Sequence, residues 1–340
     1  MPPTLVSSSA NNGYEVLPPL SNQVRYWPLI VNCVVNKFRA QVGDSFTITE
    51  NGYDQINSDF KALLNLIYSK SGNNMYQPGE IVSSKTRTVV LDKGKHYRAK
   101  LGFILMSTDL AAESDFIDMV PDGVGIHITR LKTDDLTTNE TLAHHIDEMA
   151  DAASRIQPDA KPDVICYSCT SGSIVNGEEN VMAEITKGAP YAKPMTIATG
   201  VVDALRELGV KKIVVGTPYI DEINTAEADF LVDKGFEILD IQGLNLTTGL
   251  EFGYVTPAYW KKFALEIDHS EADAIFLSCS GIRALEVVDE IEAIVNKPVI
   301  TSNQAQMWSC LRRAGIDDKI IGFGRIFEKP GLSLQLPKSE

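Results

Sequence analysis

From Lys100 onward, short apolar runs alternate with longer stretches in which apolar residues recur every three or four positions. Short apolar runs are typical of strands buried on both faces, and the longer stretches are typical of helices that cover a parallel sheet. The pattern predicts an α/β fold with eight strands: LGFILM at 101, GIHITR at 125, DVICYS at 163, PMTIAT at 194, KIVVGT at 212, FEILDI at 236, DAIFLS at 273 and PVITSN at 298.

The sequence predicts two of the intervening helices in detail. The stretch TTNETLAHHIDEMADAASRI places Thr137 and Glu140 at capping-box spacing, which predicts a helix start, and the apolar stripe continues to Ile156. The stretch GIRALEVVDEIEAIV, which begins at Gly281, carries a similar stripe. We therefore expect one continuous helix in each place.

The strand pattern occurs twice along the chain. The segments DVICYSCTSGS from Asp163 and DAIFLSCSGIR from Asp273 start 110 residues apart, and the same offset joins the turns that end at Asp109 and Tyr219. A constant offset over several elements indicates an internal duplication. We expect two similar lobes, each a parallel four-stranded sheet flanked by helices, at residues 98–210 and 211–328.

The ends of the chain lie outside this repeat. Residues 1–22 are rich in Pro, Ser and Asn and are predicted to form a flexible arm. Residues 23–97 form an N-terminal extension of unknown role, in which a helix is predicted from Phe60 and a docking or interface role is the simplest interpretation. Residues 329–340 form a C-terminal tail.

Charge and composition exclude several classes of partner. The net charge of −14 argues against a nucleic-acid-binding or anionic-membrane-binding surface. No apolar run approaches the roughly 18–20 residues that span a bilayer, and the N-terminus does not resemble a secretory signal. Five cysteines, an odd number, suit a reducing compartment. These features predict a cytoplasmic protein that acts on a small molecule.

Two cysteines, Cys169 and Cys279, follow duplicated strands and are each followed by hydroxyl residues and Gly. Ligands of open α/β sheets bind beyond the carboxyl ends of strands, where helix N-termini offer free N–H groups. Such N–H groups are expected to lower the pKa of each thiol and to bind a carboxylate. Two opposed thiols can move a proton across a carbon, or one can add to a double bond while the other handles the proton. The alternative is that both are buried structural cysteines.

Other polar residues are weaker candidates. Asp109 either caps the following helix or meets a substrate ammonium, and Tyr219 either donates a hydrogen bond to a carboxylate or packs in its turn. Arg283 is expected to form a surface ion pair, and the histidines, including His144 and His145, are interpreted as structural. Cys166 and Cys169 form C-x-x-C, but Cys166 lies inside a strand and further ligands are not apparent, so neither a redox nor a metal site is predicted.

These motifs resemble the aspartate/glutamate racemase superfamily, on its maleate isomerase and arylmalonate decarboxylase branch. The resemblance rests on CTSGS at Cys169, GTPY ending at Tyr219, SCSGIR around Cys279 and LGFILMSTDLAAESDF from Leu101. It implies two α/β lobes around a cleft, no cofactor or metal, and a homodimer or higher homo-oligomer. It assigns Cys169 as nucleophile and Cys279 as the opposing acid or base. It also implies that the substrate is held by Asp109, Thr170, Ser171, Tyr219, Ser280 and Gly281.

Two positions in the sequence indicate which enzymes of this branch the chain resembles most. Arylmalonate decarboxylases resemble this pattern with Gly at the position of Cys169, which makes decarboxylation the weaker interpretation. Maleate isomerases have Pro-Ser-x-Asn where this chain has a turn ending in Thr108-Asp109, a motif similar to the ectoine-utilisation proteins. We therefore expect a cofactor-independent isomerase of a small carboxylic acid, with maleate-type cis–trans isomerisation favoured. The alternatives are an amino-acid racemase, an arylmalonate-type decarboxylase and a non-catalytic small-acid binding protein.

Overall fold

The computed structural model describes residues 84–329 of the chain. The predicted arm at 1–22, the helix from Phe60, Cys33 and nearly all of the C-terminal tail therefore lie outside the described residues. Within the described part of the chain, none of the helices is long and apolar enough to cross a membrane.

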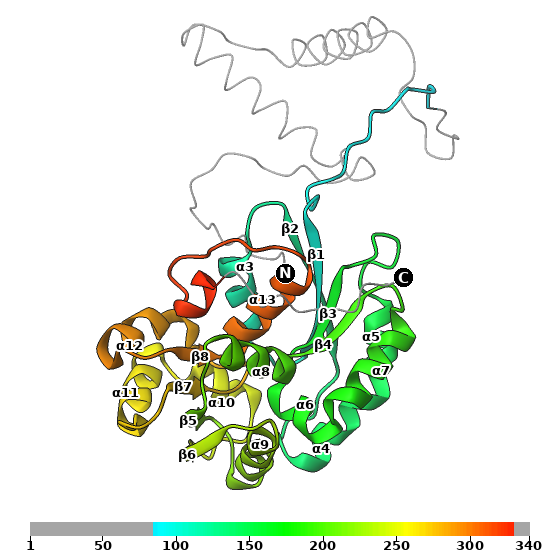
Figure 1. Ribbon diagram of the computed structural model, residues 1–340. Coiled ribbons are helices and arrows are strands. Elements are labelled where there is room, and N and C mark those ends of the chain that lie inside the picture. The colour runs from blue at the N-terminus through cyan, green and yellow to red at the C-terminus, as the bar shows by residue number, and fades with distance from the viewer. Residues whose placement is uncertain (1–83, 330–340) are drawn as a thin grey trace, which may run out of the picture. The chain divides into compact units, whose positions relative to one another are not determined.

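Two parallel four-stranded sheets form the framework (Figure 1). The first sheet has the order β2-β1-β3-β4 and the second has the order β6-β5-β7-β8, so each lobe repeats the same topology. This confirms the predicted fold class, and the shared strand order supports the duplication. The strands are β1 (Ala99–Met106), β2 (Val124–Leu131), β3 (Val164–Tyr167), β4 (Lys193–Thr196), β5 (Lys212–Thr217), β6 (Glu237–Gly243), β7 (Ala274–Leu277) and β8 (Val299–Thr301).

Helices connect the strands and cover the sheets, as parallel crossovers require. The first lobe contains α3 (Ala112–Met119), α4 (Asn139–Ala143), η2 (His144–Glu148), α5 (Met149–Ser154), α6 (Thr170–Asn176), α7 (Glu178–Gly188) and α8 (Ile197–Glu207). The second lobe contains α9 (Asp221–Asp233), α10 (Gly249–Tyr254), α11 (Pro257–Ile267), η3 (Leu285–Val287), α12 (Val288–Val295), α13 (Ser302–Arg313) and η4 (Arg325–Glu328).

The last long helix of each lobe packs against its counterpart. Helices α8 and α13 are in contact, and α13 also contacts α3 and β3 of the first lobe. The approach is close at Gly200, where an added Cβ would lie 2.8 Å from Gln306 Cα. Because small residues allow two helix backbones to approach, this glycine permits the close contact between α8 and α13.

Both helices that were expected to be continuous are interrupted. Residues 137–156 form α4, the 3₁₀ helix η2 and α5 rather than one helix, and the N-cap is Thr138, paired with Thr141, instead of Thr137 with Glu140. The segment after Cys279 begins as a turn and becomes helical only at Leu285. Both expectations of one continuous helix were wrong, because apolar spacing does not distinguish an α-helix from a helix broken by a 3₁₀ turn.

Candidate active site

Cys169 lies at the point where β3 passes into α6. Its backbone is extended (φ −131°, ψ 113°), and it is the N-cap residue of α6. The Gly172 backbone N–H donates to Cys169 Sγ over 3.3 Å, so the sulfur occupies the place of an N-cap oxygen. The strand–Cys–helix arrangement expected here is therefore present.

Cys279 follows β7 at the equivalent place but has a different backbone. Its φ is +122°, a region that L-residues rarely adopt. The Gly281 N–H donates to Cys279 Sγ over 3.3 Å, and the Cys279 N–H donates to Ser302 Oγ over 3.0 Å. A turn rather than a helix N-terminus holds this thiol, which corrects the expectation that both cysteines precede a helix directly.

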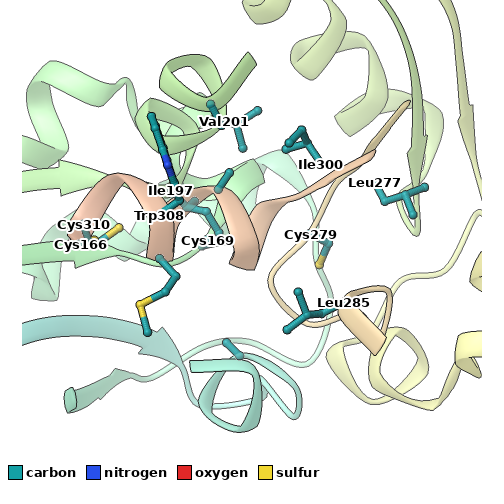
Figure 2. Packing of buried hydrophobic residues seen from close by; sticks show 14 of the residues in the cluster. Cys166, Cys169, Ile197, Val201, Leu277, Cys279, Leu285, Ile300, Trp308 and Cys310 are labelled. Carbon is teal, nitrogen blue, oxygen red and sulfur yellow. The ribbon is translucent and has the colours of Figure 1, made fainter. Parts of the chain in front are cut away.

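The two thiols line one cavity although they come from different lobes. Figure 2 shows Cys169 and Cys279 apart from the pair Cys166 and Cys310. The cavity is lined by Met106, Thr108, Asp109, Thr133, Asp134, Leu136, Thr137, Thr141, Leu142, His145, Cys169, Ser171, Tyr219, Gly249, Phe252, Cys279, Ser280 and Gly281. The duplicated strand ends therefore converge on a single site.

Of the predicted substrate contacts, Thr170 is the one that does not line this cavity. Its hydroxyl donates instead to Ser302 Oγ over 2.9 Å, and the same Ser302 oxygen accepts from the Cys279 N–H. Thr170 thus connects the N-terminal end of α6 to the turn that carries Cys279. Its side chain contributes to the relative position of the two thiols.

Each thiol has a buried tyrosine beside it. Tyr219 stands beside Cys279 and Tyr167 stands beside Cys169, and each phenol lowers the pKa of its neighbouring thiol. Tyr167 Oη also lies 2.6 Å from His145 Nδ1 in a buried contact. The sequence did not assign Tyr167 to the site, and it led to the interpretation of His145 as structural. Strand periodicity contains a signal for Tyr167, since residues two apart along an extended chain point to the same side, as Tyr167 and Cys169 do.

Burial dominates the electrostatics of both thiols. Loss of solvent raises the pKa of Cys169, although the Gly172 N–H and the hydroxyls of Ser171 and Tyr167 lower it. Loss of solvent likewise raises the pKa of Cys279 far above its ordinary value, against the opposing effects of Tyr219 and Gly281. The expectation of lowered pKa values was wrong, because desolvation of a fully buried sulfur outweighs a few N–H donors. Both groups are thiols at rest.

Asp109 uses only one of its two carboxylate oxygens within the protein. Oδ1 accepts from the Ala111 and Ala112 N–H groups at 3.0 and 2.9 Å and so holds the first turn of α3. Oδ2 is buried without a hydrogen-bond partner, and Asp109 lines the cavity. Among the described residues that line the cavity, none is Lys or Arg, and Asp134 is a second acid.

A buried polar network lies behind the cavity. Asn303 Nδ2 donates to Asp115 Oδ2 and to the Ser280 carbonyl, both over 2.7 Å. Gln306 Nε2 donates to Asn303 Oδ1 over 2.9 Å, and Ser168 Oγ donates to Gln306 Oε1 over 2.8 Å. Burial raises the pKa of Asp115 to about 8. The network connects the residues adjacent to both thiols, so α13 fixes the two walls of the site together.

The remaining candidates occupy places outside the cavity. Cys166 and Cys310 are buried free cysteines, and Cys166 Sγ faces Gln306 Oε1 at 3.5 Å. Arg283 forms an exposed ion pair with Glu286 at 2.9 Å, as expected. His144 is exposed and faces Asp147, whereas its neighbour His145 reaches the site. The interpretation of His145 as purely structural did not anticipate its place in the cavity wall.

Comparison with known proteins extends this picture. The arylmalonate decarboxylase of Bordetella bronchiseptica is 29% identical over 195 residues, which is 54% of this chain and 78% of that protein. The maleate isomerase of Alcaligenes faecalis is 23% identical over 234 residues, 65% of this chain and 90% of that protein.

Solved structures of the same branch share the fold. A Pseudomonas putida maleate isomerase with maleate matches with a TM-score of 0.64 at 22% identity, covering 69% of this chain and 99% of that one. A cysteine-to-serine mutant of the Nocardia farcinica maleate cis-trans isomerase, with a covalently bound succinylcysteine intermediate, matches with a TM-score of 0.63 at 23% identity, covering 67% of this chain and 98% of that one. A family model described as arylmalonate decarboxylase matches residues 111–327, more than half of the chain. The protein with the paired-thiol cavity is therefore a member of the arylmalonate decarboxylase family.

Proposed function

We propose that the protein is a cofactor-independent isomerase of a small carboxylic acid, with maleate-type cis–trans isomerisation as its reaction. The observation that carries the proposal is the convergence of Cys169 and Cys279 from duplicated strand ends on one cavity. The maleate isomerases among the relatives, and the succinylcysteine intermediate of the Nocardia farcinica enzyme, support thiol addition.

In the proposed mechanism, the Cys169 thiolate adds to one carbon of the double bond while the Cys279 thiol gives its proton to the other carbon. The new C–S bond leaves a single bond between the two carbons, and the substrate rotates about it. Cys279, now a thiolate, removes the proton again as the C–S bond breaks, which restores the double bond in the trans form. Each turnover thus ends with Cys169 as a thiolate and Cys279 as a thiol, as it began.

The cavity offers neutral donors for the substrate carboxylates. The cavity wall includes Ser171, Tyr219, Ser280 and Gly281. Backbone N–H groups at such a turn suit an anion. Tyr219 is held by edge contact with Phe252, their ring centroids 5.8 Å apart. We assign these residues, together with Asp109, to substrate binding, and Thr170 to positioning through Ser302.

A specific observation favours amino-acid racemisation as a second candidate. The unpartnered Asp109 Oδ2 suits an ammonium group, and a dicarboxylate would meet this carboxylate without Lys or Arg in the described cavity wall. Asp109→Asn is expected to lower the KM for a dicarboxylate and to weaken binding of any substrate that carries an amine. A lower KM for the dicarboxylate together with a higher KM for the amine-bearing substrate would show that Asp109 binds an ammonium group.

Proton NMR in deuterated buffer tests the proposal directly. Maleate, aspartate, glutamate, diaminobutyrate and an arylmalonate are supplied separately to the wild type, to Cys169→Ala and to Cys279→Ala. Cys310→Ala is the matched control, because it removes a buried free thiol that does not line the cavity. Fumarate formed from maleate by the wild type and the control, but by neither active-site variant, is the expected result.

The other outcomes each favour a different function. Deuterium exchange at an amino acid's α-carbon identifies a racemase, and carbon dioxide release from the arylmalonate identifies a decarboxylase. No turnover of any acid, with ligand binding intact, favours a small-acid binding protein. A cytoplasmic location and a homodimer or higher homo-oligomer remain predictions, and sedimentation velocity of the full chain tests the second.

A further inference from the structure

The strained backbone of Cys279 is in contact with two side chains of a neighbouring helix. Ser302 and Asn303 are the first two residues of α13, and both are buried. Ser302 Oγ accepts from the Cys279 N–H over 3.0 Å, and Asn303 Nδ2 donates to the Ser280 carbonyl oxygen over 2.7 Å. The start of α13 therefore holds the backbone on both sides of the Cys279 Cα.

The same two side chains also contact the first lobe. Ser302 Oγ accepts from the hydroxyl of Thr170, the first residue of α6, over 2.9 Å. Asn303 Nδ2 donates to Asp115 Oδ2 over 2.7 Å, and Asp115 lies on α3, the helix whose first turn is held by Asp109. The turn that carries the second thiol is thereby connected to α6 and α3, which carry other residues of the site.

The first lobe has apolar side chains at the equivalent positions. Its corresponding helix, α8, begins with Ile197 and Ala198 after an N-cap threonine, as α13 begins with Ser302 and Asn303 after an N-cap threonine. Ile and Ala side chains have no hydrogen-bonding groups. Cys169, the cysteine of that lobe, has an ordinary φ of −131°, whereas its counterpart in the second lobe has a φ of +122°. The polar pair and the strained cysteine thus occur in the same lobe.

We propose that Ser302 and Asn303 are positioning residues that hold Cys279 in its strained conformation and so place its thiol in the cavity shared with Cys169. Strained backbone of this kind persists only where the surrounding structure enforces it. Without these contacts the backbone is expected to relax and to move the sulfur from the Gly281 N–H, which donates to it over 3.3 Å. The inference deepens the proposed function and rests on it for the role of Cys279 as acid and base.

The test asks whether Ser302 and the Cβ of residue 279 act on the same strain. The equilibrium constant of unfolding is measured by urea denaturation of the full chain, for Ser302→Ala in the Cys279→Ala and the Cys279→Gly backgrounds. Both backgrounds lack the sulfur, and they differ only by the Cβ that causes the strain. Ser309→Ala is the matched control, because Ser309 is buried on the same helix and its hydroxyl donates to Asp203 over 2.7 Å, outside the cavity.

The two backgrounds are expected to respond differently. In the Cys279→Ala background, relaxation of the strained turn offsets part of what Ser302→Ala removes, and in the Cys279→Gly background there is no such strain to release. We therefore expect Ser302→Ala to raise the unfolding constant about five- to thirtyfold more in the Cys279→Gly background. Ser309→Ala is expected to raise it equally in both. Asn303→Ala replaces Ser302→Ala if the latter does not fold. Equal effects in both backgrounds overturn the proposal, because a merely structural hydrogen bond is additive with the Cβ.

Turnover distinguishes this inference from the proposed function. With Cys279 intact, Ser302→Ala is expected to lower kcat for maleate by about tenfold or more, because small displacements of reacting groups are costly. KM is expected to stay within about twofold, because the residues assigned to the carboxylates are unchanged, and Ser309→Ala is expected to change neither constant. An unchanged kcat in an active enzyme overturns the positioning role. Unequal unfolding effects in a chain without isomerase activity contradict the proposed function and leave the hold on Cys279 standing.

Discussion

Replacing Cys279 by Gly and by Ala separates the thiol from the backbone that carries it. Both substitutions remove the sulfur and its contacts with Tyr219 and Gly281, and they differ only by the Cβ. At φ +122° a Cβ stores strain of about 1–3 kcal/mol. Gly relieves that strain, and its larger freedom in the unfolded chain costs about 0.5–1 kcal/mol. Cys279→Gly is therefore expected to be more stable than Cys279→Ala by roughly 1 kcal/mol.

Cys310 supplies the control with the opposite sign. It lies inside helix α13, where Ala is unstrained and Gly is unfavourable, so Cys310→Ala is expected to be more stable than Cys310→Gly by about 0.5–1 kcal/mol. The free energy of unfolding from urea denaturation measures all four variants. A more stable Ala variant at both positions, or a more stable Gly variant at both, would refute the argument that the second thiol is held by a strained turn.

Three further predictions concern stability and the cavity surroundings. Burial raises the pKa of Glu227 from 4.5 to about 7, so the native state loses stability as pH rises from about 4.5 to 7. The free energy of unfolding of Glu227→Gln, measured by urea denaturation, is therefore expected to be higher than that of the wild type by roughly 3 kcal/mol at pH 8 and equal to it near pH 4. Gly200→Ala is expected to destabilise the fold by about 1–3 kcal/mol, because its methyl group would meet Gln306 Cα at 2.8 Å, and thermal melting checks this. Arg283→Ala removes an exposed ion pair with Glu286 and is expected to leave the melting temperature and turnover unchanged.

The fold was predictable because its signals are local and repeated. Buried parallel strands appear as short apolar runs, and the offset of 110 residues that joins Asp163 to Asp273 implied the same sheet in both lobes. Parallel strands place their carboxyl ends at one edge, so two cysteines after equivalent strands were expected to meet. The cavity lined by Cys169 and Cys279 agrees with that expectation.

What escaped prediction depends on long-range packing. Thr170 turns to Ser302, which is 132 residues away in the chain. His145 meets Tyr167 from an interrupted helix that apolar spacing represented as continuous. The pKa values of the thiols depend on how completely the lobes exclude water, which no motif records. The positive φ of Cys279 could not be predicted from the sequence either, because a positive φ is usually indicated by Gly and this position carries Cys.

The differences between the two lobes bear on which reaction the site performs. A two-thiol racemase exchanges the roles of acid and base according to the hand of its substrate, so it needs two thiols of matched acidity. Addition to a double bond needs the reverse: one thiol that ionises readily and one that keeps its proton. Here Cys169 occupies the N-cap of helix α6, whereas Cys279 lies on a turn with φ +122° and burial raises its pKa far above the ordinary value. The asymmetry thus favours cis–trans isomerisation, whereas Asp109 favours an amine-bearing substrate. The pH midpoints for alkylation of the two thiols by iodoacetamide, followed by mass spectrometry of each cysteine peptide, decide between these indications: well-separated midpoints fit addition, and coinciding midpoints fit racemisation.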